Sequence, residues 1–162
     1  MSRGGLPGHR ANEGTEAAAM GVCIDGAGLS IPDVVAVARG GASVSLDLDA
    51  RRRIDRASAY VDTLLRRERP VYGVTTGFGR FADIVISPDD SATLQRNLLL
   101  SHASGVGELL PNEVVRAILL LRANALACGY SGARAEVVDT LIAMLNQGVH
   151  PQVPSQGSVG SS

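Results

Sequence analysis

Apolar residues recur at helical spacing in several separate stretches of this chain, and this periodicity limits the fold more than any other feature. One amphipathic helix is predicted from Asp49 to about Arg67, with arginines on the face opposite the apolar one. Its apolar face consists of Ile54, Ala57, Val61, Leu64 and Leu65. A shorter helix is predicted from the cap Ser30 through Ala38, ended by the glycine pair 40–41. A short strand is predicted within residues 42–48, where Val44, Leu46 and Leu48 alternate.

Three further helices are predicted in the second half of the chain. The first follows Ser87-Pro88-Asp89-Asp90, which provides a cap, a proline in the first turn and two acidic residues at the positive end of the helix dipole. The second opens at Pro111 and ends at Gly129, and the third runs from about Ala133 to Asn146, with Gly148 at its end. The residues expected to be buried are Leu94, Leu98 and Leu99 in the first, Val114, Val115, Ile118, Leu121 and Ala125 in the second, and Val137, Val138, Leu141, Met144 and Leu145 in the third. The sequence therefore predicts a mainly α-helical fold, with long glycine-rich connections at residues 71–87 and from 148 onward.

The composition indicates a globular chain and argues against several classes of function. With 162 residues, 45% of them hydrophobic, the chain can bury one core. A formal net charge of -1 is not that of a nucleic-acid-binding or polybasic membrane protein. Cys23 and Cys128 are far apart and lack the spacing of metal ligands, so neither a disulfide framework nor a metal site is expected. No apolar run reaches the roughly 18 residues of a membrane span, and no signal pattern is present. We expect a cytoplasmic protein with a disordered leader at residues 1–20.

The loop "VYGVTTGFGRFA", residues 71–82, is the first candidate site, because glycine-rich segments between well-formed helices usually serve a backbone geometry or a site. Its glycines Gly73, Gly77 and Gly79 are compatible with a phosphate-binding loop, but no Gly-Lys-Ser/Thr follows and no strand-to-helix context frames them. A nucleotide-binding module is therefore less favoured than a tight turn that needs positive φ. Tyr72 lies on this loop and not in a helical stripe, which favours a functional role.

Two other segments carry polar side chains at notable places. In "NLLLSHASGVG", residues 97–107, His102 ends the leucine stripe, where an imidazole suits the negative end of the helix dipole. In "LRANALACGYSG", residues 121–132, Arg122 and Asn124 interrupt an apolar helix. Alone, these patterns indicate a helix C-cap and solvent exposure or helix contacts, respectively.

Four segments together resemble the aromatic amino acid ammonia-lyase family, which includes histidine, phenylalanine and tyrosine ammonia-lyases and related aminomutases. They are "VYGVTTGFG", "LQRNLLLSHASGVG", "LRANALACGYSGAR" and "LIAMLNQGVHPQVPSQGSVG", in the family's order and spacing, and the resemblance covers about residues 29–162. It implies a mainly α, L-aspartase-like fold and a homotetramer. Residues 21–162 would be the N-terminal portion of an enzyme about three times as long.

The resemblance also implies a self-made cofactor, 4-methylidene-imidazol-5-one (MIO), which the family forms from an Ala-Ser-Gly tripeptide after "GSVG". Here Ser161 stands at the alanine position and Ser162 at the serine position, and the following glycine is not present in this chain. In ring closure the amide nitrogen of the third residue attacks the carbonyl of the first, and a glycine, lacking Cβ, allows this tight fold. The chain as given lacks that nitrogen, so we expect it to be inactive alone.

The roles of three residues follow from the same resemblance. Tyr72 matches a loop tyrosine with a proton-transfer role, although a phenol with its reference pKa of about 10 is a poor base. Ser101 and His102 match the pair associated with substrate choice, where Ser-His resembles histidine lyases. The implied reaction, that of a carbon–nitrogen lyase, is elimination of ammonia from L-histidine to give urocanate.

Several alternatives stay open. "VTTGFG" in place of "VNTGFG" favours another aromatic amino acid, so a phenylalanine or tyrosine ammonia-lyase or an aminomutase is the alternative within the family. A non-catalytic, truncated assembly partner is the alternative outside catalysis. Arg122, Asn124 and Ser131 match family positions and are interpreted as structural.

Overall fold

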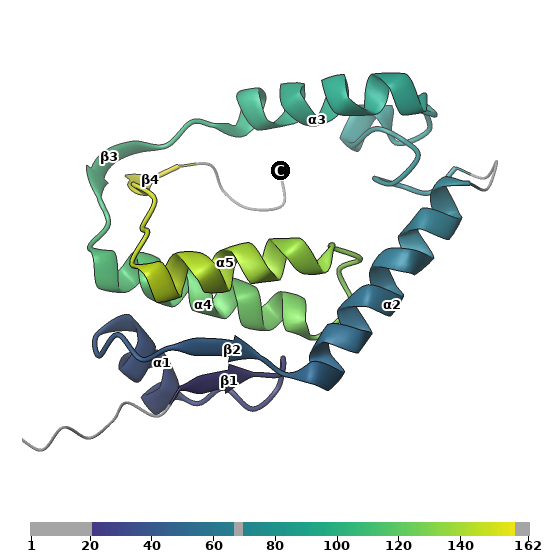
Figure 1. The fold of residues 1–162 in the computed structure, drawn as a ribbon. Coiled ribbons are helices and arrows are strands. Elements are labelled where there is room, and N and C mark those ends of the chain that lie inside the picture. Colours follow the sequence, from purple (N-terminus) through teal and green to yellow (C-terminus); the bar gives the residue numbers. More distant parts are fainter. Residues whose placement is uncertain (1–20, 67–69, 158–162) are drawn as a thin grey trace, which may run out of the picture.

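Two helices, α4 (Asn112–Ala127) and α5 (Ala135–Gln147), lie side by side in opposite directions at the centre of the fold (Figure 1). The computed structural model describes residues 21–66 and 70–157, so the expected leader lies outside the described residues. α5 ends at Gly148, whose φ of 68° is the left-handed conformation predicted for a helix-ending glycine. Within the described ranges, no helix has the length and apolar character that crossing a membrane requires.

A small β–α–β unit precedes the longer helices. β1 (Val22–Ile24) and β2 (Val44–Leu46) are parallel neighbours, and α1 (Ile31–Ala38) connects them and packs on α4. The sequence predicted α1 and β2 but not β1, because a three-residue strand is too short for alternation to be recognised.

The start of α1 confirms the predicted cap. The Ser30 hydroxyl accepts from the Asp33 amide at 3.3 Å, and the Asp33 carboxylate accepts from the Ser30 amide at 2.9 Å, which together form a capping box. Hydrogen bonds from the Ser30 hydroxyl, and next from its amide, hold the pKa of Asp33 below its ordinary value. The boundary of this helix is therefore encoded locally.

α2 (Leu48–Leu65) begins at the N-cap Asp47, whose carboxylate accepts from two first-turn amides, each at 2.9 Å. Leu48, expected to continue the strand, is instead the first residue of α2 and is 70% exposed. Ile54 is buried as predicted. Leu65 is 54% exposed, contrary to the prediction, because the last turns of α2 extend beyond α4 and α5 (Figure 1).

The hydrophobic core lies among α1, α4, α5 and the two-stranded sheet, with the first turns of α2 at its edge. Its buried members are Val22, Ile24, Val37, Ala42, Val44, Ile54, Val115, Leu119, Leu120, Ala123, Ala135, Val138 and Leu145. In α5, Val138 and Leu145 are buried as predicted, Leu141 and Met144 pack against the core, and Val137 is 41% exposed. One charged side chain, Arg116, is enclosed with them and is 9% exposed.

α4 buries a different face from the predicted one. Val115 is buried as expected, but Val114, Ile118 and Leu121 are 37%, 44% and 50% exposed, and Ala125 is also exposed. The buried residues of α4 are Val115, Arg116, Leu119, Leu120, Ala123 and Ala127. Because α4 carries apolar residues on both faces, periodicity could not distinguish the face that meets α1 and α5.

Two asparagines connect distant elements through backbone groups. The Asn124 side chain accepts from the Gly26 amide at 2.9 Å. The Asn146 side chain accepts from the Val44 amide at 2.8 Å and donates to the Val44 carbonyl at 2.9 Å. The structural interpretation of Asn124 therefore has a specific contact, whereas Arg122 and Ser131 are exposed.

α3 (Pro88–His102) lies apart from the central pair and does not pack extensively on another described helix (Figure 1). The cap Ser87 accepts from the Asp90 amide at 3.1 Å, as predicted. Leu99 was expected to be buried and is 72% exposed, because no described element covers that side of α3. After α3, β3 (Val106–Leu109) pairs in antiparallel fashion with β4 (Pro154–Gln156), which the sequence had left as irregular chain.

Candidate active site

The loop between α2 and α3 is held in shape by its own hydrogen bonds. The Val71 amide donates to the Thr75 hydroxyl at 2.7 Å, and the Gly77 amide donates to the Ile84 carbonyl at 3.1 Å. Thr76, between them, is 3% exposed. The loop therefore folds back on itself around a buried threonine and presents Tyr72 on its surface, where this side chain is 63% exposed.

The three predicted glycines serve different purposes. Gly73 has a φ of 70°, and a Cβ at this position would lie 3.0 Å from the Phe78 ring. Gly79, with a φ of 55°, begins the short 3-10 helix η1 (Gly79–Phe81). Gly77 is buried and is not among the glycines with positive φ. Two of the three therefore meet the tight-turn requirement.

Tyr72 is oriented by contacts within this loop. Its ring meets the Phe78 ring edge to face, with centroids 6.0 Å apart and an interplanar angle of 82°. Its hydroxyl oxygen accepts from the Gly79 amide over a long 3.4 Å. Because the oxygen acts as an acceptor here, its own O–H proton can be donated to a group in front of the loop.

Ser101 and His102 form the last turn of α3 and share one acceptor. The Ser101 hydroxyl donates to the Leu98 carbonyl at 2.9 Å, and His102 Nδ1 lies 2.9 Å from the same carbonyl and 2.9 Å from the Ser101 oxygen. A carbonyl only accepts, so these contacts assign the proton of the neutral ring to Nδ1. Nε2 is then the acceptor nitrogen of the imidazole. His102 is also the final residue of α3, as predicted.

The loop and the end of α3 enclose an open cavity of about 910 Å³. Four of the predicted site residues line it together, namely Tyr72, Gly79, Ser101 and His102, whereas Gly73 and Gly77 do not. The remaining lining residues are Phe78, Leu94, Asn97, Leu98, Leu99 and Ala103. The cavity thus combines a phenol, a hydroxyl and an imidazole with apolar walls, an arrangement suited to an aromatic ligand with a polar edge.

Asn97 is a polar lining residue that the sequence did not single out. It lies four residues before Ser101 on α3, and such residues share one face of a helix. Its amide offers both a donor and an acceptor to the cavity. The i, i+4 spacing from Ser101 was the available signal.

β3 and β4 return the end of the described chain to the vicinity of α3. A Cβ on Gly157 would lie 3.9 Å from the Cα of Gly105. Gly105 is only three residues after His102, at most about 11 Å of extended chain. The predicted ring-forming residues Ser161 and Ser162 lie outside the described residues. The described chain ends at Gly157, beside Gly105, which follows α3.

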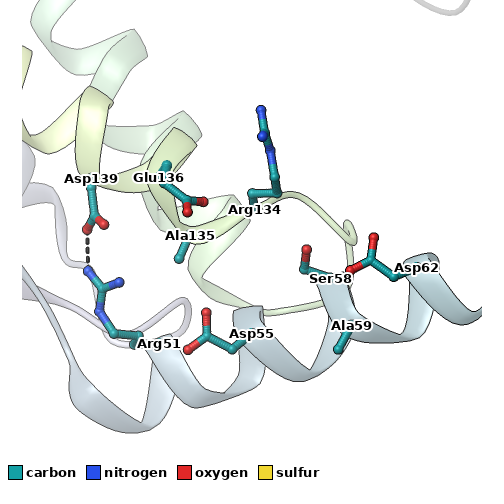
Figure 2. A pocket seen from close by; sticks show the side chains of 9 residues that line it. All are labelled: Arg51, Asp55, Ser58, Ala59, Asp62, Arg134, Ala135, Glu136 and Asp139. Carbon is teal, nitrogen blue, oxygen red and sulfur yellow. Dashed lines mark hydrogen bonds and ion pairs between the residues drawn. The ribbon is translucent and has the colours of Figure 1, made fainter. Parts of the chain in front are cut away.

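A second, polar groove of about 370 Å³ lies between α2 and the start of α5 (Figure 2). An ion pair between Arg51 of α2 and Asp139 of α5 crosses it, and this hydrogen bond raises the pKa of Arg51. Asp55, Asp62 and Glu136 are further acidic residues on its walls, and Arg134 is the other cation. Across residues 21–66 and 70–157, no three potential ligands are grouped to hold a metal ion. The groove is a charged contact between α2 and α5.

Comparison with known proteins identifies the family. Residues 29–162 match the family model described as aromatic amino acid lyase. The chain belongs to the aromatic amino acid lyase family. Both the Tyr72 loop and the Ser101–His102 turn lie within the matched residues, and the predicted family is confirmed.

Individual relatives of this chain agree with that placement. The histidine ammonia-lyase of Symbiobacterium thermophilum is 58% identical over 137 residues, which cover 85% of this chain and 27% of that protein. The structure of histidine ammonia-lyase from Trypanosoma cruzi is 38% identical with a TM-score of 0.79, over 87% of this chain and 27% of that one. The structure of the ergothioneine-degrading ergothionase of Treponema denticola is also 38% identical, with a TM-score of 0.81, and the match covers 86% of this chain and 28% of that one.

These structures confirm the mainly α-helical ammonia-lyase fold of the described residues. The chain spans 27–28% of the length of the curated relatives. The chain therefore corresponds to a minor part of those proteins.

Proposed function

We propose that this chain is the N-terminal part of a histidine ammonia-lyase-like enzyme that eliminates ammonia from L-histidine to give urocanate. The observation that carries the proposal is the Ser101–His102 pair, which lines one cavity with Tyr72. Eight curated relatives named histidine ammonia-lyase, 46–58% identical to this chain, support it.

His102 is proposed to recognise the substrate ring. In a neutral imidazole with its proton on Nδ1, Nε2 is an acceptor nitrogen, and the imidazole of L-histidine carries an N–H that could donate to it. The phenyl ring of phenylalanine carries none, so a site that hydrogen-bonds its ligand disfavours it. Tyrosine carries an O–H donor, so this hydrogen bond does not distinguish it from L-histidine. The leucines on the cavity wall suit the apolar faces of any of these rings.

Tyr72 is proposed to move a proton at its phenol oxygen. It lines the cavity together with the end of α3, and the Gly79 amide and the Phe78 ring hold its orientation. Removal of a β-hydrogen from the substrate needs a group that accepts a proton, which for Tyr72 is the phenolate form. Tyr72 is assigned this step, and His102, the other titratable side chain on the cavity wall, is assigned recognition of the ring.

Ser161 and Ser162 would supply two of the three residues of the proposed MIO ring, and the glycine that would complete it is not present in this chain. β4 leads to Gly157, which lies beside Gly105 and hence near the cavity. When formed, the ring supplies an electrophile for the elimination. The chain's own contributions are the orientation of the substrate by Ser101 and His102 and the proton transfer by Tyr72.

We further propose that the active enzyme is a longer, homotetrameric protein of the cytoplasm. The chain spans 27% of the Symbiobacterium relative, and exposed apolar residues surround the candidate site. Leu99 and Leu100 of α3 are 72% and 67% exposed, a state that is costly unless further protein covers them.

A chimera tests this function. Residues 1–162 would replace the matching portion of the Symbiobacterium thermophilum histidine ammonia-lyase, and the purified protein would receive L-histidine, L-phenylalanine or L-tyrosine. We expect near-ultraviolet absorbance of urocanate from L-histidine, with kcat/KM at least about tenfold above the other two substrates. Preference for phenylalanine or tyrosine would instead support the alternative lyases, and a β-amino acid product would support an aminomutase.

The matched control is the same chimera with Ser162→Ala, which removes the hydroxyl that the methylidene group requires and is expected to lose activity. The purified 162-residue chain is a second control and is expected to be inert. Appreciable turnover by this chain alone would contradict the proposal that its catalytic site is incomplete. An inactive but well-folded chimera would favour the non-catalytic assembly partner.

A further inference from the structure

Arg116 of α4 is a buried cation that joins three segments of the chain. It is 9% exposed. Its Nε and Nη2 donate to the Val37 carbonyl at 3.0 Å and 2.8 Å, and Nη1 donates to the Leu145 carbonyl at 3.0 Å. Nη1 also lies 3.0 Å from Nε2 of His150. In the described part of the chain, no carboxylate pairs with Arg116.

The two carbonyls explain how this charge is tolerated without an acidic partner. Val37 lies in the last turn of α1, and Leu145 lies in the last turn of α5. The final carbonyls of a helix lack partners within it and carry the negative end of its dipole. Arg116 therefore satisfies the ends of two helices with one guanidinium group.

His150 completes the set of acceptors around Arg116. A guanidinium group has only donors, so this contact is a hydrogen bond when His150 Nε2 is unprotonated and Nδ1 carries the ring proton. His150 is half-buried and lies just after Gly148, where the chain leaves α5. The contact therefore joins the start of the outgoing segment, residues 148–157, to the core.

The outgoing segment has few other attachments. β4 pairs only with β3 among the described strands, the four residues of β3 are all exposed, and the pairing contains an irregularity. A two-stranded pair of this kind is marginally stable by itself. Apart from His150, the segment is held by the Val149 amide, which donates to the Met144 carbonyl at 2.9 Å, and by Val153, which packs against the core and accepts from the Leu110 amide at 2.8 Å.

We propose that Arg116 and His150 form a latch that fixes the course of residues 148–157 and thereby holds Gly157 beside Gly105, near the candidate active site. Both are positioning residues, because neither lines the cavity. The relevance of the latch to catalysis rests on the proposed function, in which the ring-forming residues follow this segment. Its effect on the course of the chain is independent of that function.

Amide hydrogen exchange on the 162-residue chain, measured by mass spectrometry on peptides, tests the latch. His150→Leu removes the acceptor, and His150→Gln offers the side-chain oxygen of glutamine in its place. Gln152→Leu, at an exposed neighbour in the same segment, is the matched control. The informative peptides cover residues 105–110 and 149–157, and a peptide from α4 reports on the core.

We expect His150→Leu to accelerate exchange in both informative peptides at least about tenfold, while the α4 peptide is unchanged. His150→Gln should stay within about threefold of the parent chain, and Gln152→Leu should match it. Unchanged exchange in His150→Leu would overturn the latch. Equal acceleration in the α4 peptide would also overturn the latch, because His150 would then have a general role in stability. Exchange in His150→Gln as fast as in His150→Leu would overturn it as well. The exchange rates do not depend on the activity of the chimera. The latch and the proposed function can therefore be refuted independently.

Discussion

Replacement of Gly26 by alanine should lower the free energy of unfolding by about 2–5 kcal/mol. Gly26 has a φ of 91°, and placing a side chain in this conformation costs about 1–2 kcal/mol. The new Cβ would also lie 2.6 Å from the Cys128 amide nitrogen and 2.9 Å from the carbonyl carbon of Ala127. These are backbone atoms at the end of α4, where Ala127 is fully buried, so they have no room to move. Overpacking of this kind costs roughly 1–3 kcal/mol, and retreat of the loop would also break the 2.9 Å hydrogen bond to Asn124.

Gly41 provides the matched control, because its φ is 70° but a Cβ there would meet nothing within 4 Å. Gly41→Ala therefore incurs only the conformational cost, about 1–2 kcal/mol. The assay is equilibrium unfolding of the 162-residue chain in urea, followed by far-ultraviolet circular dichroism and extrapolated linearly to water. If the two variants agree within about 0.5 kcal/mol, the proposed steric conflict between the Gly26 loop and α4 is refuted.

Three further substitutions test other parts of the structure. Asn146→Leu leaves the buried Val44 amide without its acceptor and should cost about 1–3 kcal/mol, measured as a lower urea midpoint. Ser30→Ala removes the cap of α1 and should cost about 1 kcal/mol at neutral pH. The folded-state pKa of Asp33 is lowered, so the stabilisation from its carboxylate is present above the unfolded-state pKa and is lost as the pH falls through the folded-state pKa. The difference in stability between Ser30→Ala and the parent chain should therefore shrink in urea titrations at pH 3. In the chimera, His102→Leu should lower kcat/KM for L-histidine about 10- to 100-fold, with a smaller loss for L-phenylalanine.

Helix boundaries were predictable because their determinants are local. Ser30, Ser87 and Gly148 act within a few residues of the helix ends that they define, and each was assigned from its immediate neighbours. The strands were harder to predict. β1 pairs with a strand about 20 residues away, and β3 pairs with one nearly 50 residues away, so tertiary contacts stabilise them more than their own residues do.

The candidate site was predictable in its residues but not in its geometry. Tyr72, Ser101 and His102 were identified through the resemblance to ammonia-lyases, and only the folded loop brings them to one cavity. Arg116 was missed because an arginine inside an apolar helical stretch usually indicates a solvated position. Its burial depends on the ends of α1 and α5, two helices that adjoin it only in the folded chain.

The incorrect burial predictions have a common physical cause. A helix is apolar wherever another surface covers it, and the described residues cover only some of the apolar faces of α3 and α4. Ile118 and Leu121 were expected to be buried and are exposed on the face of α4 turned away from its buried residues, and Leu99 is exposed on α3 beside the cavity. A helix that is apolar on both faces is stable in water when both faces are covered. The mismatched residues therefore mark apolar surfaces that residues 21–157 leave uncovered, and Leu99 places one of these surfaces at the candidate active site.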